Sequence, residues 1–170
     1  MSASPTPAQR PITPADIAHL ERCVALAAEA LADGDEPFGS VLVDQAGTVR
    51  FEDRNRVKGG DATRHPEFEI ARWAAAHMSP AERAASTVYT SGEHCPMCAA
   101  AHAWVGLGEV VYAASSAQLS AWLQDWGAAA EPVAALPIQA IAPGISVVGP
   151  AHELTDAVRA LHAAQRGVQL

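Results

Sequence analysis

The stretch TVYTSGEHCPMC, residues 87–98, joins a short run of β-branched residues to a pair of cysteines. Residues 87–92 are typical of a strand, because β-branched and aromatic side chains suit a pleated surface. Residues 96–106 are typical of a helix. The sequence therefore predicts a strand that leads directly into a Cys-x-x-Cys pair at the start of a helix.

Outward from this stretch, helical and extended patterns alternate along the chain. Residues 13–34 are expected to form a helix, with Thr13 as its cap, Pro14 in its first turn and Asp16 at a capping-box spacing. A hairpin is expected over residues 38–55, with its turn at 44–47. The remaining expected elements are a helix at 65–78, a strand at 109–115, a helix at 116–126, a strand at 145–149 and a helix at 150–167. Residues 127–144 receive no assignment.

An opening hairpin followed by alternating strands and helices indicates an α/β domain. We expect a three-layer α/β/α sandwich with a mixed central sheet of about five strands. Residues 1–12, rich in Pro, Ser and Thr, are expected to form a flexible tail. Residues 13–170 are expected to form one domain, because a chain of 170 residues can build a single hydrophobic core.

Composition and charge exclude several classes of protein. The formal net charge is −8 and the only lysine is Lys58, so the chain lacks the basic surface with which proteins bind polyanions. A small, weakly charged substrate is expected, and nucleic acid is not. No apolar run suggests a membrane span or a signal peptide, so a cytoplasmic location is expected. Three cysteines do not suggest a disulfide framework.

The cysteine pair, Cys95 and Cys98, has three interpretations. A strand followed by Cys-x-x-Cys at a helix start also occurs in thioredoxin-like redox proteins. Alternatively, Cys95, Cys98, His102 and His65 could complete a structural zinc site with four protein ligands. In the third interpretation the two thiolates and His65 bind a catalytic zinc and leave one position open for water.

The catalytic interpretation accounts for more of the sequence. The pair lies at a helix N-terminus, where the helix dipole favours the thiolate form. His65 also precedes a helix, and Pro66 fits the first turn of that helix. Glu67, two positions beyond the histidine, is then placed to reach a water molecule rather than the metal. A His-x-Glu sequence followed by Cys-x-x-Cys is much more specific than either motif alone.

These motifs resemble the zinc-dependent cytidine deaminase-like superfamily, whose signature is H-x-E followed by P-C-x-x-C. The similarity covers roughly residues 13 to 126. It includes PFGSVLV, NRV, DATRHPE, TVYTSGEHCPMC and VVYAAS, in the order of the branch that contains guanine deaminases and tRNA adenosine deaminases. The resemblance implies that His65, Cys95 and Cys98 bind Zn²⁺ and that Glu67 shuttles protons.

The resemblance also suggests substrate contacts. Asn55 corresponds to an asparagine that contacts the substrate ring in related enzymes, and Phe38 would form part of the pocket wall. Two positions depart from the family pattern. His94 replaces the proline before the first cysteine and is a candidate substrate contact. Gln118 occupies the position where similar guanine deaminases carry an acidic residue, which weakens guanine as the substrate.

The function implied is hydrolytic deamination of a small aminated heterocycle, a nucleobase or nucleoside with purine slightly favoured. Water activated to hydroxide by zinc would attack the ring, and ammonia would leave. Two alternatives stay open: a non-catalytic, zinc-stabilised binding domain of the same fold, and a tRNA-editing adenosine deaminase. A homodimer is expected by analogy with the family. Trp104, Trp122 and Trp126 could line a pocket or a subunit contact, and ordinary packing is expected for each.

Overall fold

A central five-stranded sheet organises the protein, which we describe from a computed structural model covering residues 9–129 and 131–170. The strand order is β2-β1-β3-β4-β5. The first three strands in this order pair antiparallel, and β3, β4 and β5 pair parallel. The strands are β1 (Gly39–Val43), β2 (Val49–Arg54), β3 (Thr87–Gly92), β4 (Glu109–Ala114) and β5 (Val147–Val148). The predicted mixed sheet is therefore confirmed.

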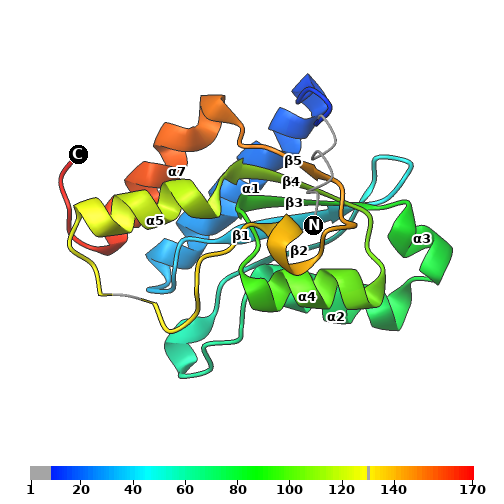
Figure 1. Cartoon of the computed structure of the whole chain (residues 1–170), viewed down its shortest axis with the longest axis horizontal. Coiled ribbons are helices and arrows are strands. Elements are labelled where there is room, and N and C mark those ends of the chain that lie inside the picture. The colour runs from blue at the N-terminus through cyan, green and yellow to red at the C-terminus, as the bar shows by residue number, and fades with distance from the viewer. Residues whose placement is uncertain (1–8, 130) are drawn as a thin grey trace, which may run out of the picture.

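Helices cover both faces of the sheet (Figure 1). On one face lie α1 (Pro14–Ala32), α5 (Ser116–Asp125) and α7 (His152–Gln165), and on the other lie α2 (Pro66–His77) and α4 (Pro96–Val105). Three shorter elements are the 3₁₀ turn η1 (Val57–Gly59), α3 (Pro80–Ala84) and α6 (Ile138–Ile141). Each face has its own apolar cluster, so the three-layer α/β/α arrangement is confirmed.

The capping residues at the start of α1 make the hydrogen bonds that the sequence predicts. The Thr13 hydroxyl accepts a hydrogen bond from the Asp16 backbone N–H, and the Asp16 carboxylate accepts one from the Thr13 N–H. Leu20 and Cys23 on this helix are fully buried against the sheet. Cys23 is thus a buried thiol of the core between α1 and the sheet.

Two short helices and one tryptophan differ from the sequence prediction. α3 begins with a capping box between Ser79 and Glu82, which the sequence analysis did not assign. α6 lies inside the unassigned segment. Trp104 is 90% exposed, so the expectation that it is packed is wrong. The buried residues of α4 are Cys98, Ala99 and His102, and Trp104 lies on the opposite side of the helix.

The N-terminal segment expected to be a tail falls partly outside the described residues, since residues 1–8 are not among them. Within the described part, the Arg10 guanidinium lies 2.7 Å from the Asp16 carboxylate and 2.5 Å from that of Glu109. The division into tail and single domain stays a prediction. Of the helices in the described ranges, none combines the length and the apolarity that crossing a lipid bilayer requires.

Candidate active site

The candidate site forms where two helices begin. His65 is the N-cap residue of α2 and Cys95 is the N-cap residue of α4, and each is followed by a proline at the first helical position. Neither N-cap side chain makes a capping hydrogen bond to a backbone N–H of its helix. Cys98 lies one turn into α4. The helix starts also present backbone N–H groups that favour negative charge, which suits thiolates.

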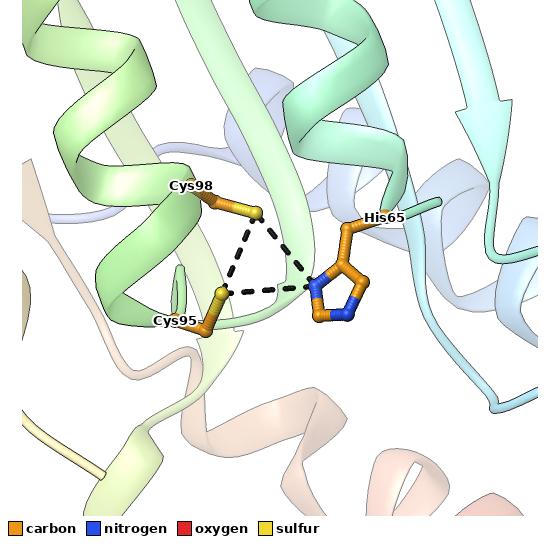
Figure 2. A group of neighbouring side chains, drawn as sticks. All are labelled: His65, Cys95 and Cys98. Carbon is orange, nitrogen blue, oxygen red and sulfur yellow. Dashed lines mark hydrogen bonds between the residues drawn. The ribbon is translucent and has the colours of Figure 1, made fainter. Parts of the chain in front are cut away.

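His65, Cys95 and Cys98 point toward one another (Figure 2). The Nδ1 atom of His65 lies 3.7 Å from each sulfur, and the two sulfurs are 3.5 Å apart. A tetrahedral zinc ion has bonds of about 2.3 Å to sulfur and 2.0–2.1 Å to nitrogen, which places its ligand atoms roughly 3.5–3.8 Å apart. The three donors therefore fit Zn²⁺ in both chemistry and spacing.

The geometry separates the three interpretations of the cysteine pair. His102, the proposed fourth ligand of a structural site, lies outside the cluster, and its Nε2 atom is 2.9 Å from the Gly108 carbonyl oxygen. Three protein donors with a fourth position open are the pattern of a catalytic zinc site. The adjacent imidazole of His65 also distinguishes the pair from a simple dithiol. The catalytic arrangement is the one that the structure supports.

The pKa values of the two thiols in the cluster are shifted in opposite directions. A hydrogen bond from Cys98, together with one from His65, lowers the pKa of Cys95 to about 4. The hydrogen bond with Cys95 raises the pKa of His65 to about 9. The hydrogen bond between Cys98 and Cys95, together with burial, raises the pKa of Cys98 above its usual value. Binding of a divalent cation would therefore release protons, because metal ligands must be deprotonated.

Glu67 is held beside this cluster by two strands. Its side chain is 5% exposed, and its Oε2 atom lies 3.8 Å from the sulfur of Cys98. Its other oxygen, Oε1, is 3.1 Å from the Ser40 hydroxyl and 2.8 Å from the Thr90 hydroxyl. Burial raises the pKa of Glu67. One oxygen is thus anchored to β1 and β3, and the other faces the metal donors.

Ser40 and Thr90 were not identified from the sequence. Both are fully buried. Ser40 is the one polar side chain of the strand GSVLV, and because a buried polar group needs a partner, that hydroxyl was a signal that could have revealed it. Thr90 lies in TVYTSG among several other hydroxyl residues, so it did not stand out in the sequence.

Asn55 and Phe38 lie side by side where β1 begins and β2 ends. The Asn55 backbone N–H donates to the Phe38 carbonyl oxygen at 3.0 Å. The Asn55 side chain is fully buried, its Oδ1 atom accepts from the Val57 N–H, and its Nδ2 atom has no partner among the described residues. The Phe38 ring lies nearly parallel to that of His65, at 11° with 6.5 Å between centroids. Phe38 therefore lies beside a metal donor, and Asn55 offers a buried, unpartnered N–H donor next to Phe38 in the chain's hydrogen-bonding pattern.

The other two predicted substrate contacts have different surroundings. His94 is only 1% exposed, and its ring packs edge to face against that of His102, with centroids 5.3 Å apart. The Gln118 side chain accepts a hydrogen bond from the Ser115 N–H and completes the capping box of α5. The structure brings neither side chain into the cluster. Both ring nitrogens of His94 are buried without a hydrogen-bond partner among the described residues, and the substrate contacts of His94 and Gln118 stay predictions.

Comparison with known proteins places the chain among deaminases. It is 31% identical over 112 residues to a probable cytosine deaminase of Schizosaccharomyces pombe, covering 66% of this chain and 68% of that protein. It is 34% identical over 96 residues to guanine deaminase of Bacillus subtilis, covering 56% of this chain and 62% of that protein. A structure of guanine deaminase from Nitrosomonas europaea shares the fold at 24% identity, with a TM-score of 0.69 and coverage of 98% and 94%.

The family model described as the cytidine and deoxycytidylate deaminase zinc-binding region matches residues 14–114, which include every member of the candidate metal cluster. The resemblance inferred from the sequence is thereby confirmed. The match covers more than half of the chain, and the cluster has the donor set that zinc requires. The chain therefore belongs to the cytidine and deoxycytidylate deaminase zinc-binding family and is a zinc-dependent deaminase.

Proposed function

We propose that the chain hydrolytically deaminates a small aminated heterocycle, a nucleobase or nucleoside, with purines slightly favoured. The observation that carries this proposal is the placement of Glu67. Its Oε1 atom is fixed by Ser40 and Thr90, while its Oε2 atom lies 3.8 Å from the Cys98 sulfur. A carboxylate held in this way can exchange protons at the metal position without acting as a ligand.

Zn²⁺ would be held by His65 Nδ1 and by the sulfurs of Cys95 and Cys98, and when bound it supplies Lewis-acid activation of water. Glu67 Oε2 takes a proton from the attacking water and passes it to the ring nitrogen. The new C–O bond forms at the carbon that carries the amine. Glu67 then moves a second proton to the amine, the C–N bond breaks, and ammonia leaves.

Burial suits Glu67 to this exchange. A pKa raised by burial brings the carboxyl group closer to neutral pH, so it can both accept and return a proton during one turnover. General acid–base catalysis of this kind is typically worth about 10²–10⁴ in rate. The two hydroxyls on Oε1 keep the carboxylate in one orientation, which avoids reorganisation during the reaction.

Asn55 and Phe38 are the proposed substrate contacts in this site. The unpartnered Nδ2 of Asn55 can donate a hydrogen bond to an acceptor on the substrate ring, and so satisfy a buried donor. Phe38 and His65 offer aromatic faces to a flat ring. Their nearly parallel rings support a planar heterocycle as the substrate.

The substrate class follows from charge and from the relatives. A net charge of −8 with one lysine disfavours a polyanion such as tRNA. Two of the relatives are named for deamination of free bases, cytosine and guanine. We therefore assign a base or nucleoside, with purine favoured.

A homodimer and a cytoplasmic location also belong to the proposal. The outward side of α4 carries the exposed Trp104, and α4 contains no Asp, Glu, Lys or Arg. An exposed tryptophan on an uncharged helix is the kind of surface that a second copy of the chain can cover. Sedimentation of wild type and Trp104→Glu tests this: the variant should sediment as a monomer, and an unchanged dimer would place the interface elsewhere.

The test of the activity is ammonia release from a panel of bases, nucleosides and pterins, with the protein stripped of metal and then reloaded with zinc. We expect release from at least one member of the panel, dependent on added zinc. Zinc-dependent stability without ammonia release from any member would favour the alternative of a non-catalytic zinc-stabilised domain. Release from tRNA but from no small molecule would favour the editing alternative.

A further inference from the structure

A small cavity of about 10 Å³ lies beside Phe38, on the side of the sheet covered by α5 and α7. Its lining includes Phe38, Glu93, Ser115, Ser116, Trp122 and His162. A space of this size holds about one water molecule, since a water needs roughly 10–15 Å³ of such volume. A single small substituent of a substrate ring would also fill it.

His162 is the unusual member of this lining. It lies on α7, its side chain is 2% exposed, and its Nδ1 atom has no hydrogen-bond partner in the described part of the chain. An unpaired buried polar atom costs free energy and is uncommon in folded proteins. The imidazole lines a cavity that is large enough for a partner, so a ligand group there would satisfy it.

The Phe38 ring lies between this cavity and the metal donor His65. Its ring packs edge to face against His162, with centroids 4.9 Å apart and an angle of 65°. The same ring lies nearly parallel to that of His65. Gly92, at the end of β3, approaches Phe38 so closely that an added Cβ would lie 3.0 Å from its Cε1 atom. A ring bound beside His65 would therefore reach the cavity past the edge of the Phe38 ring.

The polar groups that line the cavity favour a ligand group that donates hydrogen bonds. The Glu93 carboxylate accepts hydrogen bonds from the backbone N–H groups of Ser116 and Ile138, at 2.8 and 2.9 Å. It thus places negative charge in the wall of the cavity. Burial, followed by the charge of Arg166, lowers the pKa of His162 to about 3, so its imidazole is neutral at pH 7. A neutral imidazole protonated on Nε2 leaves Nδ1 as an acceptor.

We propose that His162 is a specificity-determining residue that binds an exocyclic amino group on the substrate ring within this cavity. The inference rests on the proposed function and deepens it. The substrate class becomes a small heterocycle that carries a second amino group besides the one that is removed. His162 Nδ1 can accept one N–H of such a group, and Glu93, which lines the same cavity, adds negative charge that favours a donor.

The test compares two purines that differ by one amino group, adenine and 2,6-diaminopurine. We would measure kcat and KM for both purines with wild type, His162→Leu, His162→Asn and His152→Leu. His152 is the matched control, because it is an exposed histidine on the same helix. Independently of turnover, the imidazole ¹⁵N resonances of the zinc-loaded protein would be recorded with and without 2,6-diaminopurine.

The wild type should favour 2,6-diaminopurine through a lower KM. In His162→Leu the ratio of the two kcat/KM values should fall about 3–10-fold, as expected for loss of one hydrogen bond. His162→Asn should restore part of the ratio, because its amide retains a polar atom near the Nδ1 position, and His152→Leu should leave the ratio unchanged. The diamino ligand should shift the His162 resonance.

Each contrary result has a distinct meaning. Ammonia release with no shift of the His162 resonance, or with the ratio intact in His162→Leu, would overturn this inference and leave the deaminase function standing. A shift of the resonance without ammonia release from either purine would support the binding site and contradict deamination of these substrates. Neither a shift nor ammonia release would count against both.

Discussion

In the proposed site, the metal cluster and the C-terminal region around α7 contribute in different ways. The cluster comes from two short motifs, at residues 65–67 and 95–98, each placed by the start of a helix. The wall beside it joins Phe38 from before β1, Glu93 from after β3 and His162 from α7. The chemistry is thus encoded locally, whereas the shape of the substrate pocket depends on the packing of distant segments.

Replacing a metal donor should have the largest effect. Cys98→Ala removes one of three donors, and we expect stoichiometric zinc binding and ammonia release to be lost together. Elemental analysis of the purified protein, beside the activity assay, checks this. Cys23→Ala is the matched control, because Cys23 is the third cysteine of the chain and is buried in the core away from the cluster. Full zinc content in Cys98→Ala would contradict the assignment of the cluster.

Removing one hydrogen bond from the Glu67 carboxylate should have an intermediate effect on kcat. Thr90→Val removes the hydroxyl that lies 2.8 Å from Glu67 Oε1 but keeps the shape of the side chain. Hydrogen bonds to charged groups contribute about 1.5–3 kcal/mol, so kcat should fall roughly 10–100-fold while zinc stays bound. Thr87→Val, at the other end of β3, should leave kcat unchanged. Equal losses in the two variants would indicate a general effect on the strand.

A change in the pocket wall should alter substrate binding more than chemistry. In Gly92→Ala the new methyl group would lie 3.0 Å from Phe38 Cε1, so the ring must move by a few tenths of an ångström. We expect KM to rise about 2–5-fold with little change in kcat, since the metal donors are not displaced. Gly144→Ala, where an added Cβ meets nothing within 4 Å, provides the control. A fall in kcat with an unchanged KM would contradict this prediction, because it would show that a change in the pocket wall disturbs the metal cluster.

The last prediction concerns stability rather than activity, through its dependence on pH. Burial lowers the pKa of His162 to about 3, below the value of about 6.5 that it takes in the unfolded chain. The unfolded state therefore binds more protons between these values, and the free energy of unfolding should fall as the pH falls from about 6.5 toward 3. Urea denaturation at several pH values should show a shallower loss for His162→Leu than for His152→Leu. Identical slopes would contradict the burial of His162.

The predictable parts of the protein are those with local signals. The sheet, the principal helices and the grouping of His65 with the cysteines follow from strand composition, helix starts and motif spacing. His162 and Trp104 could not be placed in this way, because their surroundings depend on which face of α7 and α4 meets another layer. Ser40 carried a signal, a hydroxyl within an apolar strand, whereas Thr90 did not stand out among the hydroxyl residues of β3, and their partner Glu67 is distant in sequence. The helix-capping role of Gln118 was not predicted, although Ser115 and Gln118 have the spacing of a capping box.

The most direct test of the central claim is the rate of ammonia release by Glu67→Gln relative to wild type, measured at equal zinc content. Glutamine keeps the size and the hydrogen-bonding position of Oε1 but cannot carry the transferred proton. We expect full zinc binding and a loss of about 10²-fold or more in kcat. A variant that retains zinc and releases ammonia at the wild-type rate would show that Glu67 is not the proton carrier.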